Sequence, residues 1–170
     1  MRMRTIVFFL MAAVMISACD RKERMMELVE TNLRQTLDNP DCIKILAMSE
    51  PDSAFGTHYF SQDEMKGMLA VMQEVTNEIM ERTDNMTSFN PEDRYVMDMA
   101  ERQMKAMSEM RSMVRQASRK GEWSGWKVKV DYQCKNNNGI DYKAERWFFL
   151  DKGGNAIFST FELPLPLKSK

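Results

Sequence analysis

Methionine thioethers are the side chains of this sequence whose type and spacing most plainly allow chemistry. Eighteen of the 170 residues are methionine, and 11 of these lie between residues 65 and 113. Four of them, Met104, Met107, Met110 and Met113, recur at every third position. Thioether sulfurs are soft ligands that suit copper(I), and side chains three residues apart can meet on a helix surface. The pattern therefore allows a copper(I) site formed by these four residues.

Two other interpretations of the methionines rank above copper. Each step of three residues advances about 300° around a helix, so the four side chains wind round it instead of forming one stripe. The first interpretation is that they are core residues, because methionine fills irregular gaps. The second is an adaptable apolar groove for a peptide, a lipid or another protein. Copper ranks last because such sites usually add histidine or cysteine, and the one histidine, His58, lies in a predicted loop.

The first 24 residues, MRMRTIVFFLMAAVMISACDRKER, predict export. Arg2 and Arg4 precede an unbroken apolar run of 11 residues, from Ile6 to Ile16. A helix needs about 20 apolar residues to cross the hydrocarbon core of a bilayer, so this run is too short to span it. A short apolar run behind a positive flank is typical of a secretory signal peptide.

The end of this segment, Ile16-Ser17-Ala18-Cys19, resembles the signal peptide of bacterial lipoproteins. The resemblance implies cleavage after residue 18, a diacylglycerol on the sulfur of Cys19, and a further acyl chain such as palmitate on its amino group. Two or more acyl chains anchor a protein stably to a membrane. We therefore expect a cell-envelope lipoprotein that faces the periplasm. Asp20 resembles the inner-membrane retention signal of enteric lipoproteins, which other lineages ignore, so the choice of membrane stays open.

Cleavage would leave 152 residues, with 19–24 as a lipidated tether and 25–170 as a single domain. The formal charge of the whole chain is −1, and loss of Arg2 and Arg4 changes it to −3. Without a basic excess we expect no nucleic-acid partner. The expected partners are the membrane, through the lipid, and an envelope protein, a peptide or a lipid ligand.

Cys42 and Cys134 are the two cysteines that remain besides Cys19. Disulfides persist in exported proteins, and both residues lie in predicted strands, so we expect them to bond to each other. Two separate buried thiols are the alternative. Their wide separation in sequence matches neither a short redox motif nor a compact zinc motif.

Ser53 and His58 are the remaining candidates. Asp52-Ser53-Ala54 resembles a short sequon that some anaerobic envelope bacteria O-glycosylate, and a plain turn is the alternative. His58 has no recognisable serine, cysteine or carboxylate constellation around it in the sequence. We therefore expect a protein without cofactor or catalytic activity, while an enzyme with an unrecognised site stays an alternative.

Helical periodicity predicts three helices, over residues 25–37, 61–82 and 90–120. Ser61-Gln62-Asp63-Glu64 has the form of a capping box, and Asn90-Pro91 supplies an N-cap followed by a proline at the first helical position. The two longer helices are expected to form an antiparallel hairpin over residues 61–120.

Strand patterns predict four strands, over residues 42–48, 126–134, 140–150 and 156–163. Residues 49–60 are expected to form a loop, and the prolines of the LPLPL tail are expected to end the last strand. The order of elements is α+β with a mainly antiparallel sheet that ends in a three-strand meander over residues 125–163. This order is loosely similar to the cystatin-like and NTF2-like architectures. We expect a membrane-anchored, non-catalytic lipoprotein with a structural or binding role.

Overall fold

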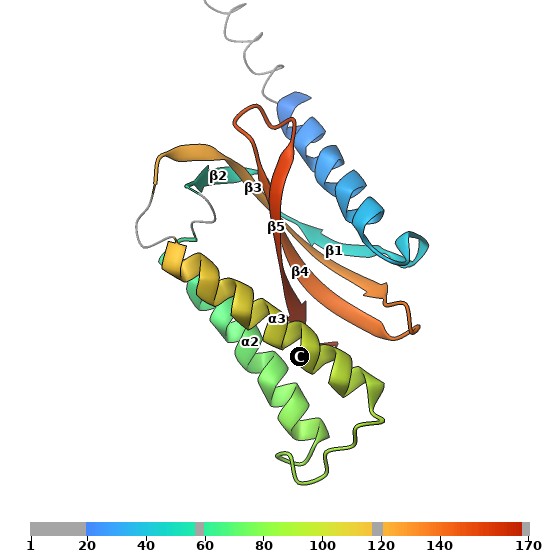
Figure 1. The fold of residues 1–170 in the computed structure, drawn as a ribbon. Coiled ribbons are helices and arrows are strands. Elements are labelled where there is room, and N and C mark those ends of the chain that lie inside the picture. The colour runs from blue at the N-terminus through green and yellow to red at the C-terminus, as the bar shows by residue number, and fades with distance from the viewer. Residues whose placement is uncertain (1–19, 57–59, 117–120, 168–170) are drawn as a thin grey trace, which may run out of the picture.

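The computed structural model describes residues 20–56, 60–116 and 121–167 (Figure 1). Residues 20–36 form an N-terminal helix. The other elements are η1 (Pro40–Cys42), β1 (Lys44–Met48), β2 (Asp52–Phe55), α2 (Gln62–Arg82), α3 (Arg94–Gln116), β3 (Trp123–Lys135), β4 (Asp141–Leu150) and β5 (Ile157–Leu165). The α+β class is confirmed.

The strands form one five-stranded antiparallel sheet around the long strand β3. The order is β1-β3-β4-β5, and β2 also pairs with β3. β1 pairs with residues 130–133 of β3, while β2 pairs with residues 123–127 further along the same edge. The predicted meander is confirmed, because β3, β4 and β5 are consecutive neighbours.

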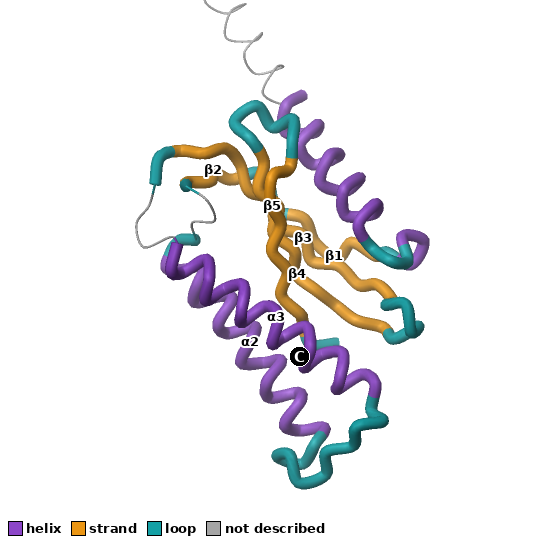
Figure 2. Tube along the Cα trace, in the orientation of Figure 1, coloured by secondary structure: helices purple, strands orange, loops and turns teal. Residues whose placement is uncertain are grey.

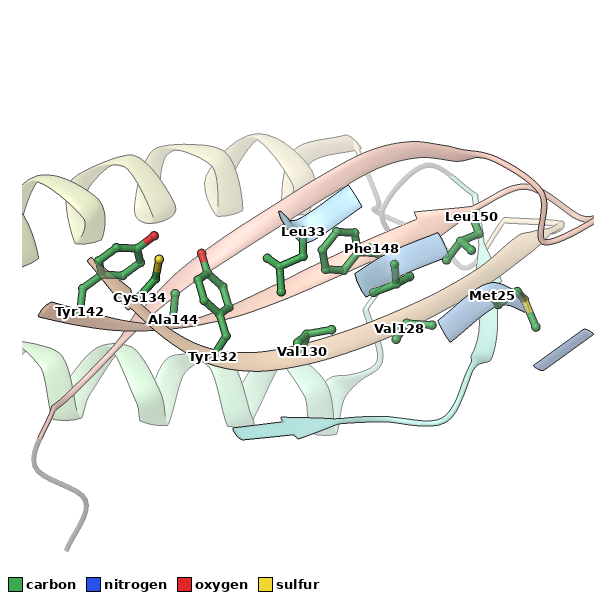
Figure 3. Close-up of a cluster of buried hydrophobic side chains, with 11 residues drawn as sticks. Met25, Leu33, Val128, Val130, Tyr132, Cys134, Tyr142, Ala144, Phe148 and Leu150 are labelled. Atoms are coloured by element: carbon green, nitrogen blue, oxygen red, sulfur yellow. The ribbon is translucent and has the colours of Figure 1, made fainter. Parts of the chain in front are cut away.

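The alternation of side chains along the strands produces a core on each face of the sheet. Even-numbered residues of β3 and β4 meet the helix 20–36, whose Val29 and Leu33 are fully buried. Figure 3 shows Leu33 close to Phe148 and above Val130, with the other labelled side chains along the same face. Apolar residues on one side of a strand and polar residues on the other thus place one face of β3 in this core.

The helices α2 and α3 cover the opposite face, so the sheet lies between them and the helix 20–36 (Figure 1). Phe60 lies edge-to-face against Trp147 and Phe149 of β4, with ring centroids 5.2 and 5.6 Å apart. The end of β4 is apolar on both faces: Trp147 and Phe149 face the hairpin, whereas Phe148 and Leu150 face the helix 20–36.

The N-terminal helix starts earlier than its apolar periodicity predicts. Residues 20–24, expected to be a tether, are already helical, and Arg24 donates a hydrogen bond to the backbone oxygen of Asp20. Lys22 forms an ion pair with Glu50 in the segment after β1. Charged residues form helices readily without contributing apolar periodicity, so the pattern of buried residues alone marks the start too late.

The sheet also differs from the prediction. β2 lies within the expected loop 49–60, and Cys42 lies in η1 instead of the first strand. β5 continues through Pro164, which pairs with Ala144, so the LPLPL tail does not end the ladder as expected. β5 is an edge strand, where a residue without an N–H group can be accommodated on the unpaired side.

The predicted N-terminal cap is correct for α2 and wrong for α3. The capping box of α2 is confirmed, because Ser61 N–H donates to the Glu64 carboxylate and Glu64 N–H donates to Ser61 Oγ. α3 is capped by Asp93 instead of Asn90: the carboxylate of Asp93 accepts the N–H groups of Tyr95 and Val96. The amide oxygen of Asn90 instead accepts the N–H of Glu92 and forms a turn before the helix.

Candidate functional site

The α2–α3 hairpin is held by polar contacts that fix which sides of the two helices face each other. The Gln103 side-chain amide donates to Thr76 Oγ1 at 2.7 Å and to the backbone oxygen of Met72 at 3.1 Å. Nearer the tip of the hairpin, the Tyr95 hydroxyl donates to the Glu78 carboxylate at 3.0 Å. The antiparallel hairpin expected from the sequence is thus present, and its seam runs between Thr76 and Gln103.

The methionines of α3 divide between the interior and the surface. Met99, Met110 and Met113 are buried, as is Ala106. Met97, Met104 and Met107 are exposed, and Met104 retains 65% of its accessible surface. At about 100° per residue, these three exposed side chains fall within about 80° of one another on the helix.

Leu69 and Met80 of α2 are exposed next to the same seam. They differ by about 20° around α2, and Thr76, which accepts the hydrogen bond from Gln103, lies in line with them. On α3, Met107 lies about 40° round the helix from Gln103 by the same geometry. Leu69, Met80 and Met107 therefore border the seam on the side away from the sheet, and Met97 and Met104 continue the exposed surface further round α3. We call this surface the outer stripe; it consists of Leu69, Met80, Met97, Met104 and Met107.

This division bears directly on the copper(I) alternative. Met104 and Met107 lie on the surface, whereas Met110 and Met113 pack in the core against the sheet. The structure therefore does not bring the four thioethers to one place. The core interpretation holds for Met110 and Met113, and the groove interpretation is left for the exposed Met104 and Met107.

A charged cleft of about 520 Å³ lies between the helix 20–36, α3 and β5. Its lining includes Asp98, Arg102, Arg146 and Glu162, and we call these four side chains its floor, with the Glu162 carboxylate of β5 as their shared partner. One oxygen accepts the Tyr132 hydroxyl and Arg146 Nε, both at 2.7 Å, and the other accepts Arg102 Nη1 at 3.2 Å. Burial and the neighbouring carboxylate raise the pKa of Tyr132, so this phenol stays protonated and acts as a donor.

The remaining groups of this floor close the network. Arg102 also donates to Asp98 at 2.8 Å, and the second oxygen of Asp98 accepts the Asn136 amide at 2.9 Å. Arg146 donates to the hydroxyl of Thr36, at the end of the N-terminal helix, at 2.8 Å. Two guanidiniums thus face two carboxylates whose oxygens are all hydrogen-bonded. The floor is electrically balanced, and its geometry suits joining α3, the sheet and the N-terminal helix.

Sequence reasoning missed this network. One local signal was available, since Asp98 and Arg102 have the i, i+4 spacing that places opposite charges together on a helix. The other partners, Arg146 and Glu162, are 16 residues apart and meet only because they are opposite each other in the β4–β5 register.

Cys42 and Cys134 are both free thiols, so the expected disulfide is not formed. Cys42 is exposed in η1, whereas Cys134 is buried in β3 with its sulfur 3.3 Å from the backbone oxygen of Asn39. Burial raises the pKa of Cys134, and the charge of Cys42 contributes in the same direction. η1 thus leaves the side chain of Cys42 exposed, whereas β3 buries that of Cys134.

Ser53, the candidate glycosylation site, lies in β2 opposite Trp126 and is half-buried. Its N–H donates to the side chain of the preceding Asp52 at 2.7 Å. The site is therefore in a short edge strand and not in a plain turn, and its modification stays a prediction. The candidate lipidation site Cys19 and the loop residue His58 lie outside the described residues.

Metal-ligand clusters and membrane-spanning helices are both absent from the described residues. Within residues 20–56, 60–116 and 121–167, no three His, Cys, Asp or Glu side chains gather in a way that could hold a metal ion. No helix in this part of the chain is long and apolar enough to cross a membrane. No protein-family model, curated protein or solved structure matches the chain, so the expected likenesses to lipoproteins and to cystatin-like and NTF2-like folds stay predictions.

Proposed function

We propose that this protein is a membrane-anchored envelope lipoprotein that binds a partner protein through the outer stripe of its helical hairpin. The observation that carries the proposal is the exposure of large apolar side chains on the sides of both helices that face away from the sheet, led by Met104 and Leu69. Contiguous exposed apolar surface on a soluble domain is typical of an interaction site. Methionine suits such a surface because its flexible thioether adapts to different partners.

The scaffold beneath the outer stripe supports a binding role. The inner sides of α2 and α3 pack against Phe161 and Leu163 of β5, and the Glu162 network joins α3 to the sheet by charged contacts. A hairpin fixed in this way presents its exposed residues in one arrangement, which lowers the entropy lost on binding.

Membrane anchoring is the part of the proposal that the sequence supports through Cys19. Asp20, the next residue, is already helical, so the lipid would be joined close to the folded domain. Replacement of Cys19 by alanine tests this directly. The native protein is expected in the membrane fraction and the variant in the soluble fraction, whereas equal membrane association of both would contradict the anchor.

Binding by the outer stripe is tested with a photo-crosslinking amino acid placed at position 104 or 107 of the lipidated protein in its native host. A discrete crosslinked product is expected at both positions, and Met104→Lys should abolish the product formed from position 107. Positions 46 and 158 serve as matched controls, because Leu46 and Phe158 are exposed apolar residues of the sheet. Equal crosslinking at stripe and control positions would overturn the proposal.

A further inference from the structure

The loop at the tip of the hairpin, Thr83–Asp93, carries a second apolar surface. Met86 and Phe89 are exposed there, retaining 53% and 42% of their accessible surface. Figure 2 shows this loop at the end of the molecule opposite to the start of the helix 20–36. A lipid on Cys19 would therefore leave the tip far from the anchoring point.

The backbone of this loop is strained. Three consecutive residues, Asp84, Asn85 and Met86, have φ angles of +46°, +53° and +69°. Each left-handed residue costs roughly 1 kcal/mol, although Asn and Asp tolerate the conformation better than other side chains. A helix C-terminus commonly uses one such residue, so the geometry of helix termination does not account for three.

Hydrogen bonds hold the strained segment in place. Thr83 is buried, and its hydroxyl accepts the N–H of Met86 at 3.2 Å while donating to the backbone oxygen of Ile79 at 2.9 Å. The N–H groups of Asn85 and Ser88 donate to the backbone oxygens of Met80 and Thr83 at 2.8 and 2.9 Å. These hydrogen bonds maintain an unfavourable backbone conformation that leaves the Met86 side chain exposed. Backbone strain that the surrounding structure maintains is common in functional segments.

Charge indicates what kind of surface the tip would meet. Between Glu81 and Arg94 there are four acidic residues and two basic ones, a net charge of −2. Arg82, one of the two bases, is already bonded to Glu78 at 3.1 Å. An acidic surround disfavours the negatively charged surface of a membrane and favours a basic protein surface.

We propose that the tip is the recognition element of the hairpin, with Met86 and Phe89 entering an apolar protein pocket that has a lysine- and arginine-rich rim. The proposal rests on the proposed binding function and names the chemistry of the partner. The outer stripe would supply adaptable apolar contact, while the fixed tip and its acidic surround would select the partner by charge.

Two fluorescent peptides test the charge requirement on the full lipidated protein in nanodiscs of zwitterionic lipid. Both are amphipathic helices with the same leucine face, one flanked by lysines and the other by glutamates. At 50 mM salt the lysine-flanked peptide should bind at least about tenfold more tightly, and the difference should shrink at 500 mM because salt screens exposed charges. Equal affinity, no binding of either peptide, or stronger binding to anionic phosphatidylglycerol vesicles would overturn the proposal.

Variants separate this proposal from the function it rests on. The double variant Met86→Asp, Phe89→Asp should weaken binding of the lysine-flanked peptide at least about tenfold, because it places charge in the apolar contact. Leu46→Asp, Phe158→Asp is the matched control and should bind normally, with circular dichroism confirming that both variants fold. If only Met104→Lys, Met107→Lys loses binding, the outer stripe remains supported and the role of the tip is refuted.

Discussion

Arg102 of α3 lies over the aromatic ring of Tyr142 in β4, with the central guanidinium carbon 3.7 Å from the ring centroid. Tyr142 belongs to the core formed with the helix 20–36, whereas the buried side of α3 packs on the other face of the sheet. Arg102 therefore reaches from the hairpin to the far face beside the edge strand β5, where it also pairs with Glu162. Together with the ion pair to Glu162, this contact joins the two cores past the edge of the sheet.

Glu162→Gln is expected to lower the free energy of unfolding by about 2 kcal/mol, because it leaves Arg102 and Arg146 without their shared carboxylate. Urea denaturation at neutral pH measures the loss. The exposed Glu74→Gln on α2 is the control and should change stability by less than about 0.5 kcal/mol. A loss as small as that of the control would show that the network does not stabilise the fold.

Asp131→Asn is expected to stabilise the protein by about 1 kcal/mol at pH 7. One carboxylate oxygen of Asp131 is buried without a hydrogen-bond partner among the described residues, and the residue lies opposite Glu145 in the β3–β4 register. Burial raises the pKa of Asp131, while the charge of Lys129 lowers it by less. The folded state thus pays for keeping this carboxylate ionised, and the neutral amide removes that cost.

The sign of the pH dependence follows from the raised pKa of Asp131. The folded protein binds a proton at Asp131 more tightly than the unfolded chain does. The free energy of unfolding of the native chain therefore rises as pH falls through the folded pKa of Asp131. The advantage of Asp131→Asn should therefore disappear at pH values below the ordinary pKa of 3.8. Thermal denaturation at pH 7 and pH 3 measures the difference in stability between Asp131→Asn and the native chain, with the exposed Asp63→Asn as control. A destabilised variant at pH 7 would contradict the prediction.

The strand prediction succeeded where apolar and polar residues alternate along the chain, because the two faces of the sheet have different surroundings there. In β3, Val128 and Val130 alternate with Lys127 and Lys129, because one face meets the apolar helix 20–36 and the other bears polar groups. β2 has only four residues on an edge and lies beside a proline, so no comparable pattern distinguishes it from a loop.

The candidate site was predictable only in part, for a physical reason. Periodicity gives the angle of each methionine around α3, and it correctly predicted that Met104, Met107, Met110 and Met113 wind round the helix. It does not say where the neighbouring elements lie, and these decide that Met110 is buried while Met104 is exposed. The backbone strain at residues 84–86 was likewise invisible, because Asp-Asn-Met has no composition that demands three left-handed residues.

Glu64→Gln is expected to destabilise the protein by about 2 kcal/mol at neutral pH. Burial alone would raise the pKa of Glu64, but hydrogen bonds from Lys127 and from the N–H of Ser61 outweigh it, so the pKa lies below its ordinary value. Lys127 is buried and lies 2.5 Å from this carboxylate, while its other acidic neighbour, Asp52, is 3.9 Å away and mostly exposed. The substitution therefore leaves a buried ammonium poorly paired.

A lowered carboxylate pKa gives stability that is present above the ordinary pKa of 4.5 and is lost as pH falls through the folded pKa. The difference in free energy of unfolding between the native chain and Glu64→Gln should accordingly narrow in acid. Denaturation curves at pH 7, 5 and 3 measure this, and Glu74→Gln again serves as the exposed control. A difference that stays constant across this range would show that the ion pair with Lys127 is not its source.

The two free cysteines are expected to differ sharply in reactivity. In a chain carrying Cys19→Ser, Cys42 should react with a thiol reagent within minutes, because it is exposed in η1. Cys134 should react only after unfolding: it is buried, and burial raises the pKa of its thiol, so little of the reactive thiolate is present at neutral pH. Counting the thiols that react before and after addition of denaturant gives one and two, respectively, and Cys42→Ser should remove the fast one. If no thiol reacts before a reductant is added, the cysteines are bonded in the oxidised protein, and η1 must move to bring Cys42 against Cys134.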